Sequence, residues 1–159
     1  MATSPQVLIA KARTYTFALM HHIIYLSRAT KRPTDDELTT LLAQARAANA
    51  QQNITGALVY GDGQFMQIIE GDEATLAMLY ARLLQDGRHE QVFKFADKPI
   101  AQRSFADWSM AFRPASAAEF AELAGYVKPE QLNLSAPGLS ATDGMLLQMM
   151  KSFVLNPGT

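Results

Sequence analysis

The sequence contains no cysteine, which excludes disulfides, thiolate metal ligands and thiol nucleophiles. It also lacks an apolar run close to the eighteen or so residues that span a bilayer. The short apolar segment 7–10 is interrupted by Lys11 and Arg13, too early for a secretion signal. We therefore expect a cytoplasmic protein with no membrane partner.

Charge of either sign is sparse and balanced, with 14 Lys and Arg against 15 Asp and Glu and a net charge of -1. A nucleic-acid surface needs clustered basic side chains to neutralise phosphates, and no such cluster occurs. A chain of 159 residues with 48% hydrophobic content is long enough for one domain with a sizeable core and some peripheral helix.

Residues 53–71 read as two strands joined by a tight turn at Gly61-Asp62-Gly63. Because side chains alternate along a strand, Gln67 shares a face with Phe65 and Ile69 and is the polar member of an apolar row. An unpaired amide there would cost about 1–3 kcal/mol. Gln67 is therefore either satisfied by neighbouring backbone or water, or it contacts a ligand.

Apolar periodicity predicts the remaining elements. Alternation predicts strands over residues 21–27, 92–97 and 108–112, the last with Trp108, Met110 and Phe112 on one face. Helical spacing, with capping boxes at Thr34 and Ser116, predicts helices over residues 34–49, 72–87, 116–128 and 144–155, with a polar loop before the last.

The resulting order, β-α-β-β-α-β-β, predicts an α+β, ferredoxin-like sandwich with one added strand. In this arrangement the first and third strands form the central pair, so Tyr25 and Gln67 would lie side by side beneath the first two helices. The methionine-rich stripe of the last helix predicts that the C-terminal helices cover the other sheet face.

No motif for hydrolysis or metal binding stands out. His21 and His22 point to opposite faces of a strand, His89 lies far along the chain, and no phosphate-binding loop or nucleophile elbow occurs. Taken singly, Tyr25 could be a core aromatic, Asn49 a helix cap and Arg88 a solvated charge. Together the polar residues indicate a flat, polar-edged ligand between two helices: Tyr25, Asn49, Gln67, Arg88 and His89.

Five segments, in order and spacing, resemble the BLUF domain, a family of flavin-binding blue-light sensors. They are residues 23–27, Asn49 with 53–58, 64–71, 86–89 and 105–110. The resemblance covers residues 20–113, after an N-terminal extension over 1–19. Residues 114–159 resemble the two-helix extension of the short, standalone members. The departures are Ala48, where some members carry a larger side chain, and the long leader.

The resemblance implies non-covalent FAD, with FMN or riboflavin as alternatives, held between the first two helices. Tyr25 and Gln67 would be the photoactive pair, and Trp108 and Met110 on the fifth strand would relay the signal. The residues that it implies in cofactor binding are Tyr25, Ser27, Asn49, Gln67, Arg88 and His89.

In such a sensor, light drives an electron and a proton from Tyr25 through Gln67, and a strengthened hydrogen bond to a flavin carbonyl shifts absorption to the red. The LOV class of flavin photosensors instead forms a covalent adduct between flavin and a cysteine. This chain contains no cysteine and cannot form that adduct. We expect a signalling module rather than an enzyme. This module would act on an unknown protein partner or on a homo-oligomer interface.

Two alternatives stay open. An acylphosphatase-like hydrolase would use an arginine and an asparagine on the same general fold, although fold alone is weak evidence for function. A purely structural oligomerising domain would satisfy Gln67 within its core. Bound flavin would separate both from a light sensor.

Overall fold

A computed structural model describes residues 20–125 and 141–155. The expected extension over 1–19, most of the polar loop before the last helix and the predicted end of the 116–128 helix lie outside these ranges. The strands are β1 (Met20–Ala29), β2 (Thr55–Gly61), β3 (Gln64–Asp72), β4 (His89–Pro99) and β5 (Ala111–Pro114). The helices are α2 (Asp35–Gln51), α3 (Glu73–Gln85), α4 (Ala117–Ala124) and α5 (Ala141–Leu155).

The five strands form one mixed sheet in the order β4-β1-β3-β2-β5. The pairs β1–β3, β1–β4 and β2–β3 are antiparallel, and β5 joins the edge parallel to β2. This is the predicted ferredoxin-like sheet with an added strand, and β1 and β3 are its central pair.

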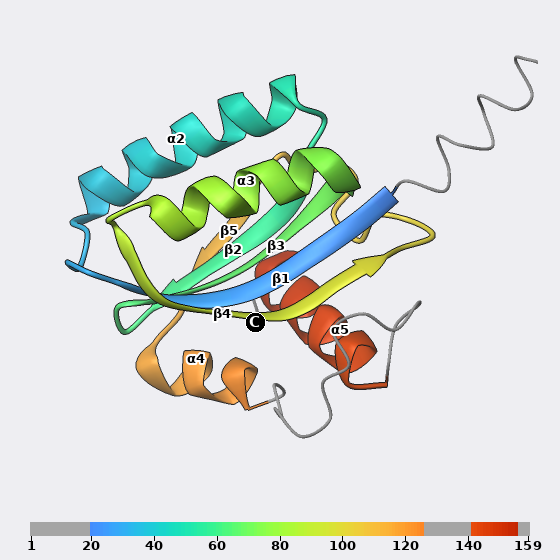
Figure 1. The fold of residues 1–159 in the computed structure, drawn as a ribbon. Coiled ribbons are helices and arrows are strands. Elements are labelled where there is room, and N and C mark those ends of the chain that lie inside the picture. The colour runs from blue at the N-terminus through green and yellow to red at the C-terminus, as the bar shows by residue number, and fades with distance from the viewer. Residues whose placement is uncertain (1–19, 126–140, 156–159) are drawn as a thin grey trace, which may run out of the picture.

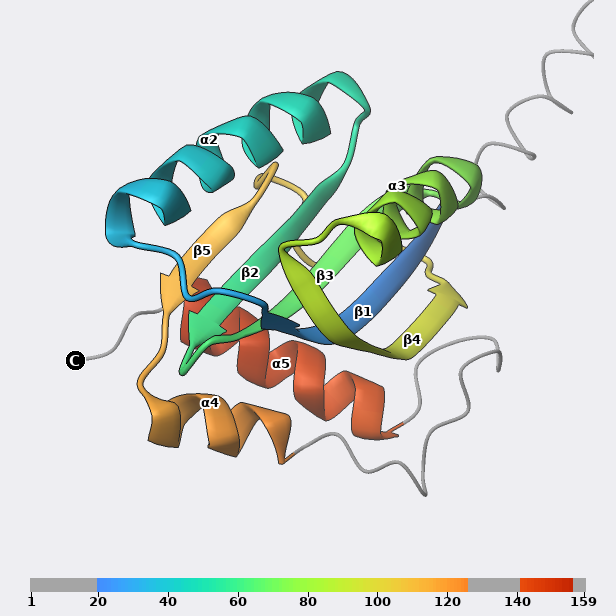
Figure 2. The same ribbon diagram turned by 60° about the vertical axis from the view of Figure 1, so that its left-hand side comes forward.

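Helices cover both faces of the sheet (Figures 1 and 2). On the face under α2 and α3, the core contains Ile23, Tyr25, Leu42, Leu58, Ile69 and Leu76. On the face under α4 and α5, it contains Ile24, Met66, Ile68, Phe120, Leu146 and Met150. Successive residues of β1 and β3 therefore enter opposite cores, as the alternation predicted.

Local signals explain where the elements begin and turn. The β2–β3 turn places Asp62 and Gly63 at positive φ, 51° and 73°, which glycine and aspartate tolerate better than most residues. At the start of α2, the Thr34 side chain accepts from the Glu37 backbone N–H while Glu37 reaches back to the Thr34 N–H. Ser116 begins α4 through the same capping box, so both predicted boxes are confirmed.

The predicted fifth strand begins too early. Residues 108–110 lie outside any strand, with bends at 109 and 110, and β5 starts only at Ala111. The Trp108 N–H donates to the Phe105 carbonyl at 3.0 Å, and the Trp108 carbonyl accepts from the Gly56 N–H at 3.0 Å. These backbone groups of Trp108 have partners outside a strand ladder, so the alternation was a false strand signal over 108–110 and a correct one over 111–112.

The fourth strand is longer than predicted and irregular. Its register against β1 shifts between Ile24 and Tyr25, because Ile24 pairs with Ala96 while Tyr25 pairs with Lys94. Phe95 is the extra residue of this bulge. Lys94 and Asp97, three positions apart, therefore lie on the same face of the sheet and form an ion pair.

Candidate functional site

An inner cavity of about 330 Å³ lies between α2 and α3, above β1 and β3. Leucine, isoleucine and alanine side chains form much of its wall, and a few polar groups converge on it. The polar or aromatic side chains that matter for its chemistry are Tyr25, Asn49, Gln67, Tyr80, Arg88 and His89.

Tyr25 and Gln67 lie next to each other at the floor of this cavity, as cross-strand partners of β1 and β3. The buried Tyr25 hydroxyl donates a hydrogen bond to Gln67 Oε1. Burial raises the pKa of the Tyr25 phenol, and the nearby Tyr80 and Asp86 raise it further. Tyr25 therefore keeps its proton at neutral pH and acts as a donor towards Gln67.

The other end of the Gln67 amide faces a weak acceptor. Gln67 Nε2 donates to the sulfur of Met110 at 3.5 Å, and Met110 is only 1% exposed. A thioether is a poorer hydrogen-bond acceptor than a carbonyl oxygen. The orientation of Gln67 is thus fixed strongly on its oxygen side and weakly on its nitrogen side.

Helix α2 holds the segment that carries Met110. The buried Asn49 donates through Nδ2 to the Ser109 carbonyl at 2.8 Å, and Arg46 Nε donates to the Met110 carbonyl at 2.9 Å. Asn49 was predicted as a cofactor contact, whereas Arg46 was missed. In the sequence, Arg46 is the single basic residue of this helix and lies at an exposed position, so it reads as a solvated charge.

Arg88 lies at the rim of the cavity, just after α3, with 64% of its side chain exposed. Its guanidinium bonds both carboxyl oxygens of Asp86, the shorter distance being 2.7 Å. These hydrogen bonds lower the pKa of Asp86 to about 2 and raise the pKa of Arg88. The rim therefore carries a fixed ion pair rather than an isolated cation.

Ser27 and His89 form a second polar contact beside the cavity. Ser27 Oγ and His89 Nδ1 lie 3.0 Å apart and share a hydrogen bond, and the His89 ring lies 5.0 Å from the Phe65 ring. Burial lowers the pKa of His89, so the neutral imidazole is favoured near pH 7. His89 lines the cavity, whereas Ser27 is not among the lining residues and reaches it only through His89.

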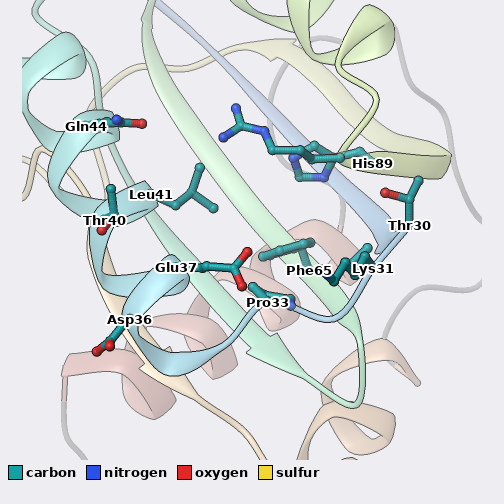
Figure 3. A pocket seen from close by; sticks show the side chains of 12 residues that line it. Thr30, Lys31, Pro33, Asp36, Glu37, Thr40, Leu41, Gln44, Phe65 and His89 are labelled. Carbon is teal, nitrogen blue, oxygen red and sulfur yellow. The ribbon is translucent and has the colours of Figure 1, made fainter.

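The inner cavity adjoins an outer hollow of about 540 Å³ and shares Leu41, Phe65, Arg88 and His89 with it. Figure 3 shows this hollow between side chains of α2, including Gln44 and Leu41, and the strand residues Phe65 and His89. Its lining carries both signs of charge, from Lys31, Asp36, Glu37 and Arg88.

Trp108 and Met110 lie in very different environments. Met110 is buried beside Gln67, whereas the Trp108 side chain is 47% exposed and does not line the cavity. The prediction that they share one face of the fifth strand is wrong, because both precede β5. Tyr80 of α3 lines the cavity but was missed, because in the sequence it lies among the leucines of the helix predicted over residues 72–87 and reads as one more core residue.

Within residues 20–125 and 141–155, no three His, Cys, Asp or Glu side chains come together as a metal site. No helix in these ranges is long and apolar enough to cross a membrane.

The fold and this cavity match a class of flavin-dependent light sensors. The family described as "Sensors of blue-light using FAD", BLUF, matches residues 20–111. The chain belongs to the BLUF family, and the resemblance drawn from the sequence is confirmed.

Individual relatives agree with this assignment. The chain is 35% identical over 89 residues to the photoactivated adenylate cyclase subunit beta of Euglena longa, covering 55% of this chain and 10% of that protein. It is 34% identical over 83 residues to the subunit alpha of Euglena gracilis, covering 52% and 8%. The chain thus spans about a tenth of the length of these relatives.

Solved structures show the same fold over more of the chain. The dark-state structure of BlrB, a BLUF protein, has a TM-score of 0.64 and 26% identity, and covers 86% of this chain and 98% of its own. A bacterial light-regulated adenylyl cyclase has a TM-score of 0.58 and 28% identity, and covers 64% of this chain and 29% of its own.

The residues present fit the cofactor of the family. A flavin ring is flat and apolar on both faces with a polar edge, and the inner cavity offers apolar helix walls and a few amide and phenol groups. The adjoining hollow, with Lys31 in its lining, offers a cation to a phosphate-bearing tail.

Proposed function

We propose that residues 20–113 form a blue-light sensor whose photoactive pair is Tyr25 and Gln67, with residues 114–159 as its output extension. The observation that carries this proposal is the chain of hydrogen bonds from the Tyr25 hydroxyl to Gln67 Oε1 and from Gln67 Nε2 to Met110 Sδ. Asn49, Arg88 and His89 would hold the flavin, and Ser27 would position His89.

Bound flavin would supply the photochemistry, as a one-electron oxidant under blue light. Tyr25 would give up that electron, and its proton would move along the existing hydrogen bond to Gln67. With the proton on Gln67, the Tyr25 oxygen would no longer donate, and the hydrogen bond that fixes the orientation of the amide would be released. When Tyr25 recovers its electron and proton, Gln67 settles in a rotated or tautomerised form that bonds a flavin carbonyl more strongly.

The weak contact with Met110 favours such a change. Once the hydrogen bond with Tyr25 is released, rotation of Gln67 has only the N–H···S contact with Met110 left to break. Met110 then loses its partner at the end of a segment that leads directly into β5. The change passes through β5 and the C-terminal helices to a partner protein or to an interface between copies of this chain.

Sensing rather than catalysis is the role proposed for this chain. The hydrolase alternative would need a phosphate-binding loop before the first helix, and the sequence contains no such motif. No observation in the described residues favours that alternative.

Replacing Tyr25 by phenylalanine tests the proposal. The variant keeps the ring and the packing but cannot supply a proton, so we expect it to bind flavin and to lack the reversible red shift. Tyr60→Phe is the matched control, because Tyr60 packs against the same helix-side core outside the inner cavity, and it should shift normally. A normal red shift in Tyr25→Phe would contradict the proposal.

A further inference from the structure

We propose that Lys94 selects Tyr25 over Tyr80 as the electron donor by holding its ammonium group over the Tyr80 ring. The inference rests on the proposed function, because it concerns the choice between two phenols beside the flavin. It assigns Lys94, which lies outside the lining of the inner cavity, a role in specificity.

Two tyrosines line the inner cavity and touch each other. The rings of Tyr25 and Tyr80 meet edge to face, with centroids 5.9 Å apart and an angle of 65° between their planes. A flavin in this cavity would lie near both phenols. Only oxidation of Tyr25 acts on Gln67, so an electron taken from Tyr80 would use the excitation without switching the sensor.

Lys94 is placed to suppress that second donor. It is the β4 cross-strand partner of Tyr25, and its Nζ lies 4.6 Å from the centroid of the Tyr80 ring. Asp97 Oδ2 accepts a hydrogen bond from this Nζ at 2.7 Å, and His21 bonds the other oxygen of Asp97. The ammonium is thus tethered above the ring, because the bulge at Phe95 puts Lys94 and Asp97 on one face.

A cation over an aromatic ring is attracted to the electrons of that ring. Removing an electron from Tyr80 would turn this attraction into repulsion, so Lys94 makes Tyr80 harder to oxidise. Burial raises the pKa of the Tyr80 hydroxyl. Of the two charges that act on this pKa, Lys94 lowers it more than Asp97 raises it, so the cation outweighs its own counter-ion at Tyr80.

Tyr25 differs from Tyr80 in having a proton acceptor for its hydroxyl and in having no cation–π contact with Lys94. Its hydroxyl already donates to Gln67 Oε1, so the acidic proton of an oxidised phenol has an acceptor in place. The cation–π contact of Lys94 falls on the Tyr80 ring. In the proposed step, Tyr25 loses one electron to the flavin and one proton to Gln67, and both return when the charges recombine.

The test measures the fluorescence lifetime of bound FAD in a Tyr25→Phe, Trp108→Phe background, in which the proposed donor and the exposed indole are absent. Adding Lys94→Met should shorten the lifetime about fivefold, the factor equivalent to a cation–π interaction of ordinary strength. Adding Tyr80→Phe to that variant should restore the long lifetime. Lys94→Arg keeps a cation over the ring and should leave the lifetime unchanged.

The inference is overturned if Lys94→Met leaves the lifetime unchanged, or if Tyr80→Phe fails to restore it. Should Lys94→Met bind too little flavin, judged by the ratio of FAD to protein, Lys94→Gln replaces it with the same expected result. Failure of the proposed function has a different signature, the absence of a light-induced red shift in the unmutated protein. The lifetimes remain readable in that case, so the two failures are distinguishable.

Discussion

Gln67 makes hydrogen bonds of unequal strength, and this asymmetry decides which of its orientations prevails in darkness. Its oxygen accepts from a buried phenol, and its nitrogen donates to a thioether. A substitution at Met110 therefore changes the free-energy difference between the two orientations through the nitrogen side alone.

We expect Met110→Leu to slow the return from the light-adapted to the dark spectrum by about two- to fivefold. Leucine keeps the volume but removes the sulfur, and a weak hydrogen bond of about 0.5–1 kcal/mol corresponds to that factor. The rate of decay of the red shift in darkness is the measurement. Met78→Leu, at an exposed position on α3, should decay at the native rate, and an unchanged rate in Met110→Leu would show that the sulfur does not hold Gln67.

His89 should make the protein less stable in mild acid. Burial lowers its pKa in the folded state, so below about pH 6.5 the unfolded chain binds more protons than the folded one. The stability from the neutral ring is complete above that pH and is lost as the pH falls towards the lowered pKa. Melting temperatures between pH 5 and 8 should fall less in His89→Gln, and parallel curves for the two proteins would exclude this role for His89.

At the scale of elements, the segment between β4 and β5 is held by groups from distant parts of the chain. Fully buried Glu70 at the end of β3 accepts from the backbone N–H groups of Ser104 and Phe105, at 2.6 and 3.0 Å, and from the Thr55 hydroxyl. Arg103 bonds the backbone carbonyls of Glu70 and Asn53. The segment that carries Met110 is thus anchored at its start by β3 and at its end by α2.

We expect Glu70→Gln to lower the free energy of unfolding by about 1–3 kcal/mol, because the new amide nitrogen cannot accept from the N–H that it faces. Urea unfolding measures the loss, and amide hydrogen exchange should speed up at Ser104 and Phe105. Glu73→Gln, exposed in the first turn of α3, is the control and should change little. Native-like exchange at Ser104 and Phe105 in Glu70→Gln would mean that Glu70 does not anchor the segment.

Sequence patterns predicted the parts of the site built on regular strands. Tyr25 and Gln67 could be placed side by side because β1 and β3 alternate without interruption. The position of Met110 could not be predicted, because its segment is shaped by Asn49 and Arg46, some 60 positions away in the sequence. Hydrogen bonds from a side chain to a distant backbone carbonyl produce no periodic pattern in the sequence.

The placement of Lys94 was missed for a related reason. The segment 92–97 reads as a plain alternating strand, which would put Lys94 and Asp97 on opposite faces of the sheet. The extra residue of the bulge brings Asp97 back to the face that carries Lys94. No residue in this segment marks the bulge in the sequence. No sequence pattern indicated that Glu70 would bond a loop.

At the scale of the whole molecule, Arg113 links the sheet edge to both C-terminal helices. This β5 residue lies three positions after Met110, and its guanidinium donates to the Phe153 carbonyl of α5 at 2.7 Å. It also lies over the Phe153 ring and 3.7 Å from Glu119 of α4. A shift of β5 therefore reaches α4 and α5 through one side chain.

We expect Arg113→Gln to separate sensing from output. The red shift should be unchanged, because Arg113 lies outside the inner cavity, whereas the light-induced change in amide hydrogen exchange over residues 144–155 should be lost. Arg32→Gln, which removes an exposed ion pair with Asp62, should keep both responses. A preserved response of α5 in Arg113→Gln would place the transmission path elsewhere.

The most direct measurement is the light-minus-dark infrared difference spectrum of the FAD-loaded protein, read at the flavin carbonyl stretch. Our account predicts that blue light moves this band to lower frequency, as a stronger hydrogen bond from Gln67 forms, and that it returns in darkness. A carbonyl band that stays in place while the visible spectrum shifts would contradict the account.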